Sequence, residues 1–250
     1  MLIKVPSLLD NAAHFVLDEK DKFALDTKPH GHGDVHSLLY GQGIVERWVK
    51  PGAEATASGA RVPVEWVVFF QDTNGLVFHS IVPALGVSAE RRLHMNSIAV
   101  PRAQGDAVGA ICALSREKPM PDSELKEGDL PNKLVINCEY NQLEGLLGKG
   151  VKEPLMPGTN YSSLPGNINV LILHAPSYLS VLHDKKGAIA EFVNPKYNAD
   201  KQSFKKPTRL ESVPIDPPPQ AALRCGVRAL RCSAAHLAVL PTVRVASAGA

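Results

Sequence analysis

Apolar side chains in this chain occur partly in short continuous runs. The clearest run is Trp66–Phe70, which consists of aromatic and β-branched residues and stops at Gln71-Asp72-Thr73-Asn74-Gly75. Such a run is typical of a strand that is buried on both faces. Ile98–Val100 and Leu134–Cys138 are further strand candidates, and the second of them ends in Glu139-Tyr140-Asn141. Polar residues therefore follow at least two of the predicted strands.

Helical spacing is found between and after these runs. Leu76–Leu85 and Tyr178–His183 place apolar residues about one helical turn apart, and Pro176-Ser177 favours a helix start before the second stretch. Arg116–Lys133 and Gly148–Pro165 are charged and contain proline, which predicts loops. Strands that end in polar clusters and alternate with helices predict an α/β sheet with a crevice at the strand ends.

The composition changes sharply after residue 212. Val213–Ala250 has no Lys, Glu, Phe, Tyr or Trp, whereas it has nine Ala and the triplet Pro217-Pro218-Pro219. We therefore expect one folded domain over residues 1–212 and a disordered or loosely attached tail over 213–250. A translated intron or a shifted reading frame would produce such a switch, so the tail is expected to be a gene-model artefact.

Charge and hydropathy narrow the classes of function. The 250 residues are 44% hydrophobic and 21% charged, as in ordinary folded soluble chains. Because 27 Lys and Arg stand against 25 Asp and Glu, the net charge of +2 predicts neither a nucleic-acid nor a membrane partner. No apolar run approaches the roughly 20 residues that span a bilayer, so a cytoplasmic location is expected.

Histidines gather in Lys28–His36, and three interpretations of this segment stay open. His30-x-His32-x-Asp34 shares part of the H-x-H-x-D-H pattern of zinc hydrolases, but a valine follows Asp34 where that pattern needs histidine. Alternatively, Gly31 and the next glycine let the backbone approach a base or a phosphate while His32 donates to an anion. The third interpretation is a solvated loop before a helix.

Three other polar positions have two interpretations each. Asp72 after a buried strand suits Mg²⁺, which prefers oxygen ligands, but it equally suits a turn closed by Asn74-Gly75. Glu139 and Asn167 are acceptors of the kind that bind sugar hydroxyls, or they belong to a strand rim and an Asn-rich turn. No Gly-Gly pair and no G-x-S-x-G motif occurs, which excludes a glycine-rich triphosphate loop and a nucleophile elbow.

Seven segments in one order resemble UDP-sugar pyrophosphorylases. They are residues 28–40, 69–76, 95–102, 139–143, 165–169, 191–197 and 204–211. The resemblance covers about residues 8–211. It implies a Rossmann-like nucleotidyltransferase sheet with helices on both faces, which here would be incomplete at both ends.

The resemblance also implies a reaction and roles for the candidate residues. The family converts UTP and monosaccharide 1-phosphates into UDP-sugars and diphosphate with Mg²⁺, for which Mn²⁺ is a possible substitute. By matching motifs, Gly31 would lie against the uridine and His32 near the nucleotide phosphate. Asp72 would bind the metal and act with His32 in catalysis, and Glu139 and Asn167 would hold sugar hydroxyls.

Two alternatives stay beside this function. One is a UTP–glucose-1-phosphate uridylyltransferase, the nearest class of enzyme. The other is a catalytically inactive fragment that binds a UDP-sugar, because family members carry the glycine-rich loop that this sequence lacks. We expect the isolated chain to lack useful activity for the same reason.

Overall fold

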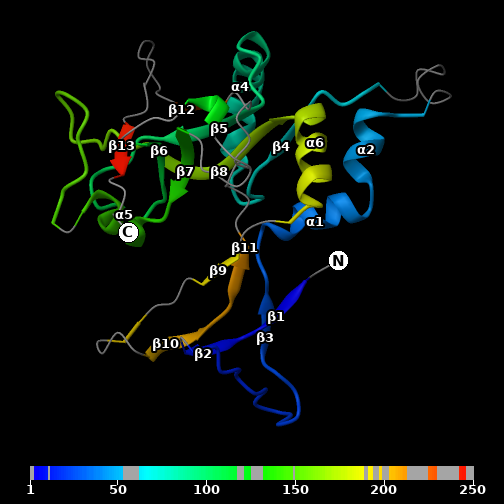
Figure 1. Cartoon of the computed structure of the whole chain (residues 1–250), viewed down its shortest axis with the longest axis vertical. Coiled ribbons are helices and arrows are strands. Elements are labelled where there is room, and N and C mark those ends of the chain that lie inside the picture. The colour runs from blue at the N-terminus through cyan, green and yellow to red at the C-terminus, as the bar shows by residue number, and fades with distance from the viewer. Residues whose placement is uncertain are drawn as a thin grey trace. The chain divides into compact units, whose positions relative to one another are not determined.

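The computed structural model describes residues 3–10, 12–52, 62–116, 121–124, 132–148, 150–188, 191–193, 197–198, 203–212, 225–229 and 242–245. The chain divides into two compact units (Figure 1). Unit 1 comprises Met1–Lys50 and Leu179–Asp216, and unit 2 comprises Pro51–Tyr178 and Pro217–Ala250.

The described part of unit 1 contains short antiparallel strand pairs and two consecutive helices. The pairs are β1 (Lys4–Pro6) with β3 (Thr27–Pro29), β2 (Leu8–Asp10) with β10 (Ser203–Thr208), and β9 (Glu191–Val193) with β11 (Leu210–Ser212). The helices α1 (Asp34–Gly41) and α2 (Ile44–Val49) are separated by Gly43, whose left-handed φ of 59° is accessible to glycine without strain.

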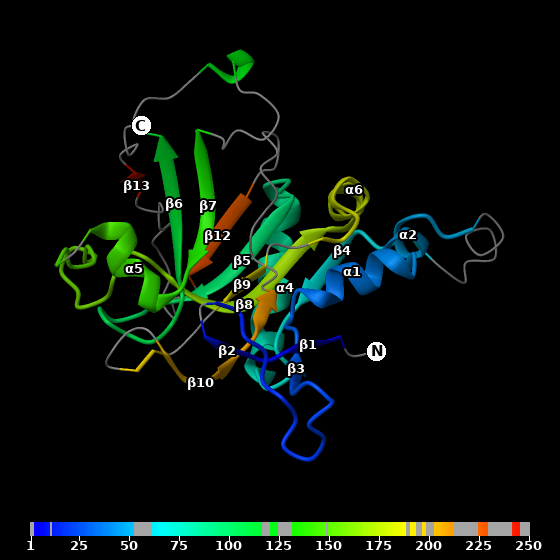
Figure 2. The same cartoon turned by 60° about the horizontal axis from the view of Figure 1, so that its bottom comes forward.

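The sheet of unit 2 is built on the long strand β8 (Gly166–His174), seen in Figure 2. β4 (Trp66–Phe69) and β5 (Met95–Val100) both pair with β8 in antiparallel register. β6 (Ala110–Arg116) pairs antiparallel with β7 (Lys133–Cys138) and meets β8 at its first residue. The predicted strands 66–70, 98–100 and 134–138 are thus confirmed as β4, part of β5 and β7.

Helices cover this sheet through two apolar clusters. α4 (Phe78–Glu90), which follows the short 3₁₀ helix η1 (Gly75–Val77), packs through Ile81, Ala84 and Leu85 on a core that contains Ile98 and Ile172. α5 (Tyr140–Leu147) adds Leu143 to a second core around Ala110, Cys112, Cys138 and Leu164. α6 (Ala175–Lys185) confirms the second predicted helix. The predicted α/β class is therefore confirmed.

Parts of the biased C-terminal segment belong to the sheet of unit 2. β12 (Cys225–Ala229) runs parallel to β5, and β13 (Thr242–Val245) runs parallel to β6. These two stretches differ from the expected loose tail because they form backbone ladders with β5 and β6. The rest of residues 213–250 lies outside the described residues, so the boundary after residue 212 stays a prediction.

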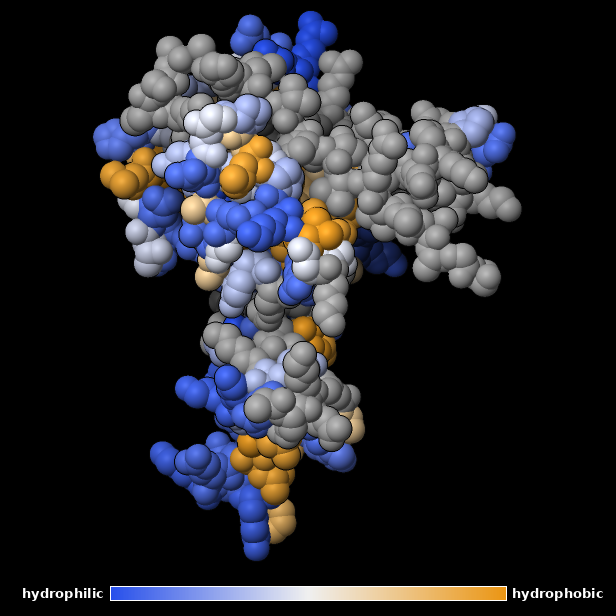
Figure 3. All heavy atoms as spheres, turned by 90° about the vertical axis from the view of Figure 1, so that its left-hand side faces the viewer, coloured by the Kyte–Doolittle hydropathy of each residue, from blue (hydrophilic) through white to orange (hydrophobic). Residues whose placement is uncertain are grey.

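On the face drawn in Figure 3, the described residues are mostly hydrophilic, and apolar side chains lie among them in separate patches. Among the described residues, no helix is long and apolar enough to cross a membrane. The expected compartment stays a prediction.

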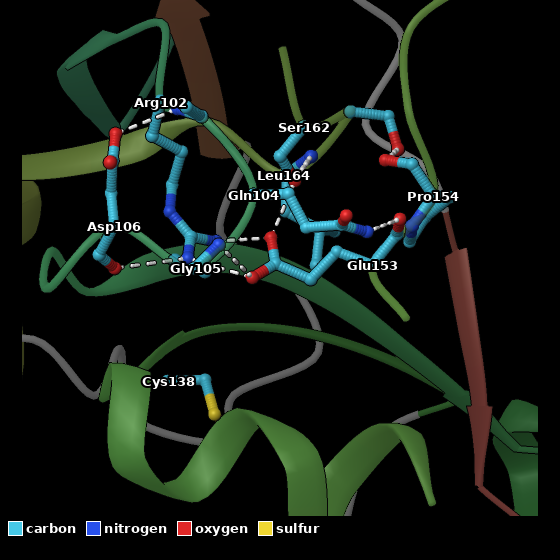
Figure 4. A network of polar contacts seen from close by, with 12 residues as sticks. Arg102, Gln104, Gly105, Asp106, Cys138, Glu153, Pro154, Ser162 and Leu164 are labelled. Atoms are coloured by element: carbon cyan, nitrogen blue, oxygen red, sulfur yellow. Dashed lines mark hydrogen bonds and ion pairs between the residues drawn. The ribbon is translucent and has the colours of Figure 1, made fainter. Parts of the chain in front are cut away.

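A buried ion pair joins the loops that lie between the strands of unit 2 (Figure 4). Arg102 follows β5, and its side chain is 1% exposed. Its Nη1 and Nη2 donate to Glu153 Oε2 at 2.7 Å and Oε1 at 3.0 Å. Ser162 Oγ donates to the same Oε2 at 2.7 Å, and the Gly105 N–H donates to Oε1 at 3.4 Å. The carboxylate is thus satisfied at both oxygens, as a buried charge requires.

Removing one member of this pair should strongly destabilise unit 2. Glu153→Ala leaves the Arg102 charge buried without its partner, and we expect unfolding free energy to fall by about 3–5 kcal/mol. Urea unfolding followed by circular dichroism measures the change. Glu90→Ala, at the exposed end of α4, is the matched control and should cost about 0.5 kcal/mol or less. Equal effects of the two substitutions would show that the ion pair does not hold the loops.

Candidate functional site

The strand register of unit 2 brings two predicted sugar-binding residues together. Ala110, the first residue of β6, pairs both with Cys138 at the end of β7 and with Gly166 at the start of β8. Glu139 directly follows Cys138, and Asn167 directly follows Gly166. The Asn167 N–H donates to the Gly109 carbonyl at 2.8 Å. A single junction of three strands therefore positions both side chains.

Hydrogen bonds connect these residues into one group, which we call the amide cluster: Asn137, Glu139, Asn167 and Asn169. Asn137 Nδ2 donates to Glu139 Oε1 at 3.0 Å. Asn167 Nδ2 donates to Asn137 Oδ1 at 3.0 Å and to Asn169 Oδ1 at 3.1 Å. The Asn169 N–H donates to Asn167 Oδ1 at 2.9 Å. All four side chains are half-buried, so the cluster is both ordered and reachable from solvent.

A bulge in β8 supports the cluster. The register with β5 skips between Ile98–Val170 and Ala99–Asn167, so Ile168 and Asn169 are extra residues in β8. Asn169 has a left-handed φ of 55°, which asparagine tolerates better than most residues. Its N–H bonds to Asn167 Oδ1, as in an Asx turn. The predicted Asn-rich turn is thus a local irregularity inside a long strand.

The sequence pattern identified Glu139 and Asn167 but missed Asn137 and Asn169. Each missed residue lies two positions from an identified one: Asn137 from Glu139, and Asn169 from Asn167. This spacing was the available signal in the sequence, although regular strand alternation does not produce it, because Asn169 lies in the bulge and Glu139 follows the end of β7.

The glycine-bracketed turn lies in unit 1, and it is occupied by the chain itself. The Gly33 N–H donates to the Ser212 carbonyl at 3.1 Å, and the Ser212 N–H donates to the His30 carbonyl at 3.4 Å. A Cβ at Gly31 would lie 2.6 Å from the Ser212 carbonyl oxygen, and one at Gly33 would lie 2.7 Å from Ser212 Cβ. Both glycines are therefore required by the close approach of β11, whatever ligand role Gly31 has.

The histidines of this turn have different surroundings. His30 is buried, with Nδ1 2.6 Å from Asp34 Oδ1 and Nε2 3.1 Å from Glu191 Oε1. His32 is exposed in the turn that leads into α1. No group of three or more His, Cys, Asp or Glu side chains able to hold a metal occurs among the described residues, so the zinc interpretation gains no support.

Asp72 lies in an exposed turn after β4. The turn is closed by the Asn74 N–H, which donates to the Gln71 carbonyl at 3.0 Å, and η1 follows. Within the described part of unit 2, no hydrogen bond or ion pair joins Asp72 to the amide cluster. Its carboxylate is solvated, and its role as a metal ligand stays a prediction.

Comparison with solved structures assigns the fold. A variant of UDP-glucose pyrophosphorylase from Leishmania major matches 91% of this chain and 43% of its own, with 15% identity and a TM-score of 0.53. The putative UDP-N-acetylglucosamine pyrophosphorylase of Entamoeba histolytica matches 92% of this chain and 50% of its own, with 14% identity and a TM-score of 0.50. The chain therefore has the fold of nucleotidyltransferase-type pyrophosphorylases. No protein-family model matches it.

Curated relatives give a sharper result. The chain is 45% identical over 219 residues to UDP-sugar pyrophosphorylase from Oryza sativa subsp. indica and 44% identical over 218 residues to that of Arabidopsis thaliana. Each match covers 86% of this chain and 32% of the relative. The resemblance is therefore confirmed: this chain is a homologue of UDP-sugar pyrophosphorylases. It spans about a third of the length of the relatives that it matches.

Substitution of Gly31 tests the structural role of the turn. Gly31→Ala forces a Cβ into the Ser212 carbonyl at a φ of 147°, so we expect a loss of about 1–3 kcal/mol in unfolding free energy. Gly41→Ala, in the same α1 region with no atom within 4 Å of the added Cβ, should leave stability unchanged or raise it. Unchanged stability in Gly31→Ala would contradict the packing on Ser212.

Burial of His36 in α1 should make unit 1 sensitive to acid. Burial lowers the pKa of His36 from its ordinary 6.5 to about 4. The unfolded chain therefore takes up this proton at a higher pH than the folded chain, and stability falls as the pH drops from 6.5 towards 4. Denaturant midpoints measured across this range should fall less in His36→Phe than in the unmodified chain. Parallel curves for the two proteins would contradict the assignment.

Proposed function

We propose that this chain provides the sugar-binding part of a uridylyltransferase, which forms a UDP-sugar and diphosphate from UTP and a monosaccharide 1-phosphate. The observation that carries the proposal is the amide cluster, in a chain 45% identical to UDP-sugar pyrophosphorylase over 219 residues. The cluster ends in a carboxylate, which accepts hydrogen bonds from hydroxyl groups. Half-buried polar groups of this kind suit a ligand rich in hydroxyls.

The proposed reaction needs no covalent nucleophile from the protein. An oxygen of the sugar phosphate attacks the α-phosphorus of UTP in line, and diphosphate leaves. The protein contributes positioning and neutralisation of charge. In this proposal, exposed His32 donates to a nucleotide phosphate, Gly31 lies against the uridine, and Glu139 accepts a sugar hydroxyl.

Magnesium is proposed as the cofactor, with Asp72 as its protein ligand. Mg²⁺ is commonly held by one or two carboxylates together with substrate phosphates and water, and Mn²⁺ takes the same oxygen ligands. A single exposed carboxylate in a turn fits that donor set. When bound, the ion would neutralise charge on the phosphates.

One assay, diphosphate release from UTP with different sugar 1-phosphates, tests two alternative functions. A UTP–glucose-1-phosphate uridylyltransferase would release diphosphate with glucose 1-phosphate but not with other monosaccharide 1-phosphates. A binding fragment without turnover would bind UDP-glucose and release no diphosphate with any of them. Diphosphate release with several sugar 1-phosphates would exclude both alternatives, and it would also contradict the expectation that the isolated chain lacks useful activity.

Binding of UDP-glucose to the chain tests the proposed sugar site. Glu139→Gln removes the charge that strengthens a hydroxyl hydrogen bond, so affinity for UDP-glucose should fall about tenfold or more while affinity for UDP stays unchanged. Isothermal titration calorimetry measures both constants. Glu90→Gln is the control and should change neither. No binding of UDP-glucose to the unmodified chain would overturn the proposal.

Binding of UTP tests the metal ligand separately. In the unmodified chain Mg²⁺ should strengthen UTP binding, and Asp72→Asn should remove most of that gain by neutralising the ligand. Affinity for UTP in the presence of a chelator should be equal in the two proteins. A Mg²⁺ effect that survives in Asp72→Asn would remove this residue from the metal site.

A further inference from the structure

Asn137 is the member of the amide cluster that contacts both predicted sugar ligands. Its Nδ2 donates to Glu139 Oε1 at 3.0 Å, and its Oδ1 accepts from Asn167 Nδ2 at 3.0 Å. Because a carboxylate only accepts and an amide nitrogen only donates, just one orientation of the Asn137 amide satisfies both partners. The orientation of Asn137 is therefore determined by its neighbours, and in turn it holds the carboxylate of Glu139.

The two predicted sugar ligands are not equally available to a ligand. An amide nitrogen has two hydrogens, and Asn167 Nδ2 donates to Asn137 and to Asn169. Asn167 Oδ1 also accepts from the Asn169 N–H. Both donor hydrogens of Asn167 are thus used within the protein, whereas its Oδ1 keeps a second acceptor position. Glu139 bonds through Oε1 only in the described part of the chain, so its Oε2 remains an acceptor.

Gly109 gives Asn137 the room that this arrangement needs. A Cβ at Gly109 would lie 2.6 Å from Asn137 Oδ1, closer than real Cβ contacts allow. The same glycine accepts the Asn167 N–H at its carbonyl. Gly109 therefore fixes the backbone of Asn167 and leaves space for the side chain of Asn137.

We propose that Asn137 is a positioning residue for sugar recognition. It orients the Glu139 carboxylate so that Oε2 accepts a hydroxyl of the sugar, and Asn167 holds Asn137 in this orientation. This inference rests on the proposed function. It adds to the sequence-based prediction a residue that the pattern missed.

The test compares UDP-glucose with UDP, which lacks the glucose. Asn137→Ala and Asn137→Asp both remove the donor to Glu139, so affinity for UDP-glucose should fall about 10- to 100-fold. Affinity for UDP should stay unchanged, because in this proposal the cluster binds the glucose, which UDP lacks. Asn160→Ala and Asn160→Asp, at an exposed position of the same unit, should leave both affinities unchanged. The proposal would be overturned if the Asn137 variants left the ratio of the affinities for UDP-glucose and UDP unchanged, whether or not both affinities fell.

Two further measurements keep the test independent of folding defects and of ligand binding. Gly109→Ala keeps Asn137 but displaces its side chain, and it should lower the UDP-glucose affinity relative to UDP in the same way. In the ligand-free chain, Glu139→Gln should shift the side-chain amide resonances of Asn137 in a ¹⁵N-correlated NMR spectrum, whereas Glu90→Gln should not. Unshifted resonances overturn the inference. Shifted resonances without UDP-glucose binding by any variant overturn the proposed function instead.

Discussion

The buried charge of Arg102 sets the arrangement of unit 2. An arginine that is almost fully removed from water needs a carboxylate at short distance, and Glu153 supplies it with two hydrogen bonds. Arg102 lies just after β5, and Glu153 lies in the segment that precedes β8. The pair therefore connects the end of β5 to the segment that leads into its antiparallel neighbour β8. Ser162 continues this connection, because its Oγ donates to Glu153 and accepts from the N–H of the core residue Leu164. This fixes where β8 begins, and hence where Gly166 meets Ala110.

The amide cluster depends on that starting point. Ala110 pairs with residues of two strands, and the side chains that follow those partners on β7 and β8 lie within hydrogen-bond reach of Asn137. A shift of β8 by one residue would exchange the faces of Asn167 and Ile168. The hydrogen bonds of the amide cluster would then be lost, and the side chain of Ile168 would take the place of Asn167. Sugar recognition and sheet packing thus share one register.

Sequence patterns predicted those helices and strands that can be recognised from their own residues, without knowledge of the segments on which they pack. The apolar run at Trp66–Phe69 and the helical spacing in α4 are local signals, and both elements were found. β8 was missed because Gly166, Asn167 and Asn169 resemble a turn in the sequence, whereas in the structure Gly166 and Asn167 pair with β5 and the strand continues beyond the bulge. Likewise, the two glycines around His32 suggested a ligand in the sequence. In the structure they make room for Ser212, and this contact was not visible because the residues are far apart in the sequence. Local chemistry was visible in the sequence, but its long-range partners were not.

The position of β8 in the chain also bears on how the protein is made. β4 and β5 leave the ribosome early, yet both form their antiparallel ladders with β8, which is synthesised much later. Until then, β4 and β5 lack the strand with which they pair in the finished sheet, and unpaired strands favour association between chains. Contacts of large sequence separation also slow folding. The ribosome needs time to translate the chain from Phe69 to Gly166. The yield in a heterologous host should therefore depend more on the length of this interval, and on the chaperones available during it, than on the stability of the completed sheet.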